Sequence, residues 1–195
     1  MSRRAHRVQD CAAYMLHATA WRETSLIVQS FSREHGCVAL VAKGAKRPYS
    51  VLRPVLSAFQ PLLLSWSGAG EVKTLTRAEV AGLRALTGTG LMSAWYMNEL
   101  LLRLLPREDA HPALFDAYDT ALQQLAGGTR AAGALRRFEW TLLRETGYGI
   151  DEAEPDFDDP ATEPALRRDL RERLAANLAG RPLSTRRVLL DLQRI

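Results

Sequence analysis

The first 80 residues alternate apolar and polar positions in short runs rich in β-branched, leucine and aromatic side chains, a pattern typical of β-strands. Five strands are predicted, at Cys11 to Leu16, Ser25 to Phe31, Cys37 to Ala42, Pro61 to Trp66 and Glu71 to Val80. In the last two, the alternation predicts that Leu62, Leu64 and Trp66, then Val72 and Thr74, face the core. Five strands in a unit of this size are most economically an OB-fold barrel, although strand counting alone leaves an SH3-like barrel open.

Beyond residue 90 the apolar period changes from 2 to 3.6, which predicts amphipathic helices. They are expected from Leu91 to Leu105, Leu114 to Leu125, about Ala134 to Thr146 and Leu166 to Leu178, with a short fifth helix capped by Ser184. The predicted class is therefore α+β. An N-terminal five-stranded OB-fold barrel over residues 1–80 is followed by an all-helical domain over 81–195, with an acidic linker at about 151–163.

Charge is segregated along the chain, whose formal net charge is +4. Residues 1–80 carry 11 basic and 5 acidic side chains, residues 151–163 carry 7 acidic and no basic ones, and residues 164–195 carry 8 basic and 3 acidic ones. Two basic regions favour a polyanionic partner. The acidic stretch is interpreted as a solvated linker, with an intramolecular competitor for that partner as the alternative.

No constellation of catalytic or metal-binding residues is apparent in the sequence. Cys11 and Cys37 are the only cysteines and form no CxxC pair, so neither a metal site nor a disulfide framework is predicted. The carboxylates of residues 151–159 lack the glycine and the ligand spacing of a calcium loop. We therefore expect neither enzymatic activity nor a cofactor. No apolar run reaches the ~18 residues of a membrane helix, so a soluble, intracellular protein is expected.

A basic, kinked loop follows the third predicted strand, in the stretch LVAKGAKRPYS. Lys43, Lys46, Arg47 and Arg53 crowd this connection, and Tyr49 lies among them as a stacking platform for bases. A solvated surface loop is the simpler explanation for a run of charges alone. In an OB barrel, however, such a loop borders a face that commonly binds single-stranded nucleic acid, which favours DNA binding. Arg22 and Arg33 are weaker candidates for the same role.

Several blocks of the sequence together resemble RecO, a family of bacterial DNA-repair and recombination-mediator proteins. The blocks are WRETSL at 21–26, GCVALVAKGA at 36–45, FQPLLL at 59–64, GEVKTL at 70–75, YMNELL at 96–101 and LRRFE at 135–139, followed by GYG at 147–149. They occur in the family's order and cover residues 11–150. The most specific pair is VAKGA with GEVKTL.

The resemblance implies an OB domain and a helical domain in a protein that binds single- and double-stranded DNA and anneals complementary strands. Together with RecR, such a protein helps to load the recombinase RecA onto DNA covered by single-stranded-DNA-binding protein (SSB). The resemblance implies no bond-breaking catalysis, and a cytoplasmic, nucleoid-associated location. A structural adaptor with an OB-like domain and incidental positive charge is the alternative that does not depend on the family.

Two departures from the family pattern stand out. Some members carry a four-cysteine zinc module in the C-terminal part, which Cys11 and Cys37 cannot supply. The stretch between Tyr148 and the last helices is also markedly shorter than the family leads one to expect.

The resemblance also implies that the helical domain binds the acidic C-terminal tail of SSB. Arg136, Trp140 and Leu143 share one helix face at spacings of four and three residues. We expect Arg136 to grip the tail carboxylate, with Arg137 as a weaker candidate, near a pocket to which Trp140 and Leu143 contribute. The alternative is that the arginines pair with acids such as Glu139 and that Trp140 packs against a neighbouring helix.

The C-terminal end carries a further basic group, formed by Arg181, Arg186 and Arg187. These residues flank the predicted fifth helix and are candidates to extend the DNA-binding track. A solvated helix terminus is the alternative.

Overall fold

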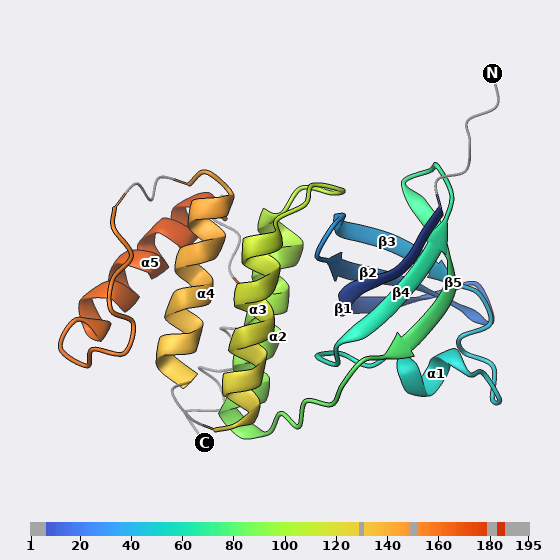
Figure 1. The fold of residues 1–195 in the computed structure, drawn as a ribbon, viewed down its shortest axis with the longest axis horizontal. Coiled ribbons are helices and arrows are strands. Elements are labelled where there is room, and N and C mark those ends of the chain that lie inside the picture. The colour runs from blue at the N-terminus through green and yellow to red at the C-terminus, as the bar shows by residue number, and fades with distance from the viewer. Residues whose placement is uncertain (1–6, 129–130, 149–151, 179–182, 186–195) are drawn as a thin grey trace. The chain divides into compact units, whose positions relative to one another are not determined.

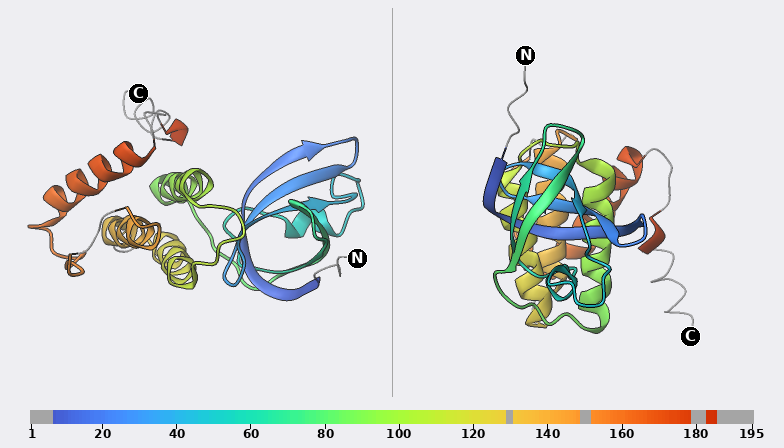
Figure 2. Two further views of the ribbon diagram at one scale, coloured as in Figure 1. Left: turned by 90° about the horizontal axis from the view of Figure 1, so that it is seen from above. Right: turned by 90° about the vertical axis from the view of Figure 1, so that its right-hand side faces the viewer.

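Five strands close into a barrel in the computed structural model of the chain (Figures 1 and 2). The strands are β1 (Arg7–Trp21), β2 (Ser25–Ser32), β3 (Gly36–Ala42), β4 (Leu62–Ser67) and β5 (Val72–Val80). The structure describes residues 7–128, 131–148, 152–178 and 183–185.

The barrel has the strand order β1-β2-β3-β5-β4, and it is the order of an OB-fold. The first half of β1 pairs with β4 and its second half pairs with β2, so this one long strand closes the ring. The pair β3–β5 is parallel and the other pairs are antiparallel. A short helix, α1 (Leu52–Val55), lies between β3 and β4 in the chain and was not predicted, because four residues are too few to show a period. The predicted fold class is confirmed.

Two details of the barrel differ from the prediction. Strand β1 continues to Trp21, five residues beyond the predicted end, because residues 17–21 pair with β2 although most of them are exposed. In β5 the inward positions are Lys73 and Leu75, whereas Val72 is exposed, so the predicted inward phase of Val72 and Thr74 is wrong. The β4–β5 register shifts between Ser65 and Trp66, and such a shift reverses which residues of a strand face inward.

The buried ammonium of Lys73 is satisfied by a segment from outside the barrel strands. Its Nζ forms an ion pair with Glu108 and donates a hydrogen bond to the Gly70 carbonyl at 3.3 Å. The Glu108 amide in turn donates to the Cys37 carbonyl at 3.0 Å. Gly36, with φ of +63°, lies so close to Asp109 that a Cβ would stand 1.8 Å from its carbonyl oxygen. Residues 106–112 therefore pack on the barrel.

Four longer helices follow: α2 (Gly88–Leu104), α3 (Pro112–Ala126), α4 (Ala131–Glu145) and α5 (Glu163–Asn177). Apolar side chains from all four are buried, as the 3.6-residue period predicts. The Tyr118 hydroxyl donates to Asn98 Oδ1 at 2.5 Å, which satisfies a buried polar pair between α2 and α3. No helix among the described residues combines the length and the apolar character needed to cross a membrane.

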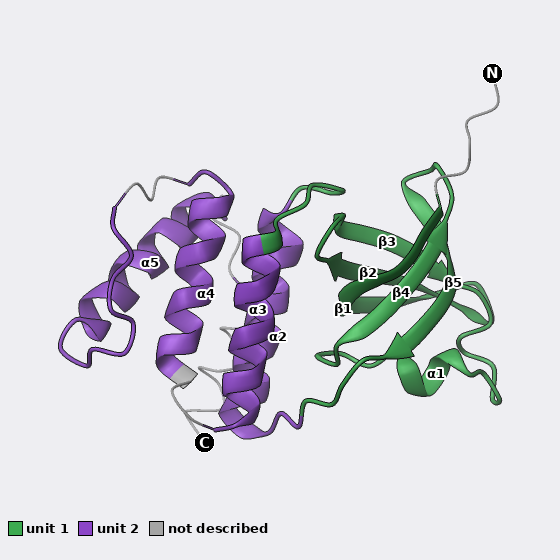
Figure 3. Cartoon of the chain, in the orientation of Figure 1, with its two compact units in different colours: residues 1–84, 106–112 green, residues 85–105, 113–195 purple. Residues whose placement is uncertain are grey.

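The chain divides into two compact units (Figure 3). The barrel unit comprises Met1–Arg84 and Pro106–Pro112, and the helical unit comprises Ala85–Leu105 and Ala113–Ile195.

The acidic stretch packs within the helical unit in its described part, residues 152–163. Phe157 is buried, and its ring lies edge-on to Trp140 with ring centroids 6.2 Å apart. Arg173 on α5 binds Glu152 at 3.0 Å. Phe157 is therefore an apolar anchor against α4 in a stretch whose other residues are mostly exposed.

Candidate nucleic-acid interface

Two segments that carry exposed cations meet at one end of the barrel, and one of them also carries the exposed Glu23. The Lys46 amide donates a hydrogen bond to the Thr24 carbonyl at 2.8 Å, which ties the loop after β3 to the β1–β2 turn. The β2–β3 ladder also ends here, where Leu26 pairs with Ala42, the last residue of β3. We call the exposed cations of these two segments, Arg22, Lys43, Lys46 and Arg47, the basic rim.

The loop after β3 is a series of tight turns. The amides of Arg47, Ser50 and Arg53 each donate to the carbonyl three residues earlier, at 3.0 to 3.3 Å. Gly44 permits the first turn, since its φ of +72° lies in the left-handed region that favours glycine. The turns lead directly into α1, so they place Arg53 near the rim and hold the loop compact.

The cations of the rim have no carboxylate partner among the described residues, and the same is true of Arg53. Elsewhere, Arg77 is paired with Glu79 and Arg103 with Glu99, whereas the exposed Arg144, Arg167 and Arg168 have no carboxylate partner among the described residues either. Like charges gathered on one loop repel one another unless an anion joins them. Several cations in a row without carboxylate partners have the charge pattern that a phosphate backbone matches.

The other candidates for DNA contacts are placed differently. Arg33 lies in the β2–β3 turn, at the opposite end of the seven-residue strand β3, about 20 Å from Lys43 at the usual rise per residue. Tyr49 is 99% exposed, so nothing in the barrel fixes its ring. Arg181, Arg186 and Arg187 lie outside the described residues. The structure thus brings together Arg22, Lys43, Lys46, Arg47 and Arg53, and it separates Arg33 from them.

Sequence reasoning assigned no role to Trp21, the last residue of β1. Its side chain is 45% exposed, and the Arg22 guanidinium carbon lies 5.9 Å from the centre of its ring. The available signal was the tryptophan next to an arginine at a predicted turn, in the block WRETSL. The rim therefore has an exposed indole beside its cations.

The residues predicted to bind the SSB tail lie on α4. Arg136 is 6% exposed, and its Nε lies 2.8 Å from Glu139 Oε2. Trp140 and Leu143 are buried as well, since the acidic stretch and α5 pack within the same unit. Arg136 is thus paired with Glu139 rather than free to grip a tail carboxylate, and the aromatic ring contact of Trp140 is with Phe157 of the acidic stretch rather than with a helix residue.

Arg137 is the accessible member of this group. Its side chain is 42% exposed, its guanidinium lies 5.1 Å above the ring centre of Phe157, and its Nε is 3.9 Å from Glu154. The structure therefore has a basic side chain of α4, Arg137, over an aromatic ring, Phe157. An acidic segment of the chain itself already contacts it.

Glu139 belongs to a buried polar cluster. Burial raises the pKa of its carboxyl, and the neighbouring Arg136 guanidinium and the Tyr96 hydroxyl oppose this shift. The Tyr96 hydroxyl donates to Glu139 Oε1 at 2.7 Å, and burial raises the pKa of Tyr96 as well. Arg136 is therefore the counter-charge that Glu139 needs in order to be buried.

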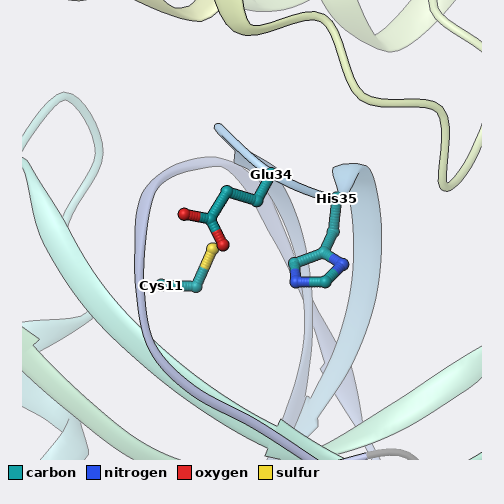
Figure 4. A group of neighbouring side chains, drawn as sticks. All are labelled: Cys11, Glu34 and His35. Carbon is teal, nitrogen blue, oxygen red and sulfur yellow. The ribbon is translucent and has the colours of Figure 1, made fainter.

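A group of possible metal ligands, which the sequence did not suggest, lies near the β2–β3 turn (Figure 4). The donor atoms of Cys11, Glu34 and His35 lie within 4.8 Å of one another. Three protein ligands are fewer than a closed structural zinc site uses. Burial raises the pKa of the Cys11 thiol, which disfavours the thiolate that a metal requires. His35 stacks edge-on to Trp66 with ring centroids 5.3 Å apart, so packing accounts for its position.

Comparison with known proteins extends over most of the chain. The family model for the N-terminal part of Recombination protein O matches residues 7–84, and that for its C-terminal part matches residues 86–154. DNA repair protein RecO of Ralstonia nicotianae is 45% identical over 240 aligned positions, which cover 100% of this chain and 88% of the relative. That alignment is longer than the 195 residues present here, so the relative has residues without a counterpart in this chain.

Two further relatives match a shorter region at higher identity. DNA repair protein RecO of Aromatoleum aromaticum is 63% identical over 145 residues, and that of Cupriavidus pinatubonensis is 57% identical over 145 residues. Each alignment covers 74% of this chain, but only 60% and 50% of the respective relatives. The two family models follow each other along the chain in the order barrel, then helices. The chain therefore belongs to the RecO family of DNA repair proteins.

Proposed function

We propose that this protein is a non-enzymatic recombination mediator that binds single- and double-stranded DNA and anneals complementary strands. The observation that carries the proposal is the basic rim: cations from two segments of the barrel, held together by the hydrogen bond between Lys46 and Thr24, without carboxylate partners in the described chain. Neutralising phosphates on two strands reduces their mutual repulsion, which is what annealing requires. Membership of the RecO family supports the same conclusion.

The proposal includes help in loading RecA onto SSB-coated DNA, together with RecR. For the SSB tail we propose the surface of α4 around Arg137 as the docking site, beside the buried Trp140, whose ring contacts Phe157. Arg136 serves this site indirectly, since its guanidinium is engaged by Glu139. A tail that ends in an apolar residue with a free carboxylate would use the same features that Phe157 and Glu154 use now. Tail binding and the acidic segment would therefore compete.

A strand-annealing assay tests the proposal. Complementary oligonucleotides, bare and SSB-coated, are mixed with the protein at several salt concentrations, and duplex formation is followed by fluorescence. We expect faster annealing of bare strands, with an acceleration that falls as salt rises, and annealing of SSB-coated strands as well. A protein that leaves all annealing rates unchanged would instead be the structural adaptor.

A further inference from the structure

Trp21 lies at the turn between β1 and β2. It is the last residue of β1 and pairs with Ser25, the first residue of β2, so its backbone is held in the ladder. Its side chain is nevertheless 45% exposed. Of the other tryptophans, Trp66 and Trp140 are buried and Trp95 is 38% exposed, so Trp21 is the most exposed tryptophan of the four.

The turn that follows Trp21 fixes one side of the indole. Arg22 has φ of +52°, in the left-handed region, which is uncommon for a residue with a side chain. In this conformation its guanidinium carbon lies 5.9 Å from the centre of the Trp21 ring, within the range of a cation–π contact. The ring is thus paired with a cation and still offers exposed apolar surface.

Cations outnumber anions around the indole, where Glu23 is the one exposed carboxylate of the β1–β2 turn. The carbonyl of Thr24, in the same turn, accepts the hydrogen bond from the Lys46 amide, so Trp21 stands beside the basic rim. An exposed aromatic ring beside several cations without carboxylate partners in the described chain matches a ligand that carries both flat π faces and regularly spaced anions. Single-stranded nucleic acid has this composition, since its bases are unpaired and its phosphates are charged.

We propose that Trp21 is a stacking platform for a nucleobase of single-stranded nucleic acid whose phosphates the basic rim neutralises. This rests on the proposed function and adds to it a contact to the bases. Trp21 suits the role better than Tyr49, because the sheet already restricts its backbone, whereas the 99% exposed Tyr49 ring must be ordered on binding. Stacking is tolerant of base identity, because every base has a π face.

Paired oligonucleotides separate stacking from phosphate contacts. The affinity for a thymidine oligonucleotide is compared with that for an abasic oligonucleotide of the same length and charge. The variants are Trp21→Ala, Trp21→Phe, the triple variant Lys43→Ala, Lys46→Ala and Arg47→Ala, and Trp95→Ala as a matched exposed tryptophan of the helical unit. Circular dichroism and a thermal melt establish that each variant is folded.

We expect Trp21→Ala to weaken thymidine binding by about 5- to 100-fold, the range for loss of one stacked base. Abasic binding and the salt dependence should stay unchanged, because the phosphate contacts remain. Trp21→Phe should retain part of the affinity difference between the thymidine and the abasic oligonucleotide. Trp95→Ala should retain all of it. In addition, the thymidine oligonucleotide should quench the fluorescence of the Trp95→Phe protein but not that of the Trp21→Phe protein.

The outcomes distinguish this inference from the proposed function. If Trp21→Ala binds both oligonucleotides as the wild type does, while the triple variant loses affinity, stacking is overturned and DNA binding stands. Equal losses on both oligonucleotides in Trp21→Ala also overturn stacking, since the indole would then serve the phosphate track or a protein surface. If the wild type binds neither oligonucleotide, both the function and the inference fail.

Discussion

Glu139 Oε2 lies 2.8 Å from the Arg136 Nε in the interior of the helical unit, so each of these residues is the other's counter-charge. Removing one partner of a buried pair leaves the other as an uncompensated charge, which costs about 3 to 5 kcal/mol. We therefore expect Arg136→Ala to lower the free energy of unfolding by roughly that amount. Urea denaturation followed by circular dichroism measures the change.

The paired change Arg136→Met with Glu139→Leu supplies the control. Replacing both charges by apolar side chains removes the desolvation penalty together with the attraction, so the double variant should recover most of the lost stability. A stable Arg136→Ala protein would show that the guanidinium is free enough to bind a partner directly.

The basic rim predicts a salt-dependent effect on DNA affinity. Changing Lys43, Lys46 and Arg47 together to alanine should weaken single-strand binding without sequence preference. Each lost phosphate contact should reduce the slope of log K against log salt concentration by about 0.7. Fluorescence anisotropy over a series of salt concentrations measures both quantities.

Arg33→Ala is the matched control for the rim, because this arginine lies at the other end of β3. It should change affinity and slope much less than any single rim substitution. If Arg33→Ala and Lys43→Ala have equal effects, the bound DNA must extend along the barrel beyond the rim.

The acidic segment around Phe157 predicts competition on α4. Phe157→Ala removes the ring beneath Arg137 and should raise the affinity for an acidic peptide that ends in an apolar residue with a free carboxylate. Arg137→Ala should lower that affinity by about 1.5 to 3 kcal/mol, the range for a hydrogen bond to a charged group. Isothermal calorimetry with the peptide measures both effects.

Bare-DNA binding controls the specificity of these two changes. Neither variant should alter it, because the rim belongs to the barrel unit. Wild-type peptide affinity in a folded Arg137→Ala protein would remove this residue from the proposed docking site.

Glu99 predicts a pH dependence of the helical unit. Burial opposes its ionised form, but the Thr185 hydroxyl, the amides of Thr185 and Ser184, and Arg103 together hold the pKa of Glu99 below its usual value. A carboxyl with a lowered pKa in the folded chain adds stability above its unfolded pKa of about 4.3. That stability is lost as the pH falls through the folded pKa.

Glu99→Gln tests this linkage. The variant should be less stable than the wild type at pH 7, and the difference should shrink when the pH is lowered below about 4. Thermal melts at several pH values measure it. A difference that is constant over this range would mean that the hydrogen bonds of Glu99 do not depend on its charge.

The sequence predicted the barrel well, because strands that are buried on one face leave an alternating pattern. It missed the extension of β1 to Trp21, since that part pairs with β2 and has little burial to mark it. The separation of Arg33 from the basic rim follows from the order of the strands. Turns between successive antiparallel strands lie at alternate ends of a sheet, so neighbours in sequence order need not be neighbours in space.

The candidate site on α4 was harder to predict. A helix face with Arg136, Trp140 and Leu143 resembles a binding surface as long as nothing is known to cover it. Phe157 lies in a highly acidic stretch without periodicity, and only the folded chain shows that this ring packs against Trp140. Arg136 can be buried because Glu139 neutralises it. The sequence shows that the two residues are three positions apart, but it does not show that both lie in the interior.

The return of residues 106–112 to the barrel unit has a consequence for exchanging parts between family members. The chain leaves the barrel after Arg84, comes back for seven residues and leaves again. A fragment that ends at Arg84 would lack Glu108, leave the Lys73 ammonium without its carboxylate and uncover the edge next to Gly36. No single boundary in the sequence separates the two complete units. A chimera joined after Arg84 would combine the barrel of one parent with residues 106–112 of the other. We therefore expect chimeras of two family members to fold well only when the barrel and residues 106–112 come from the same parent.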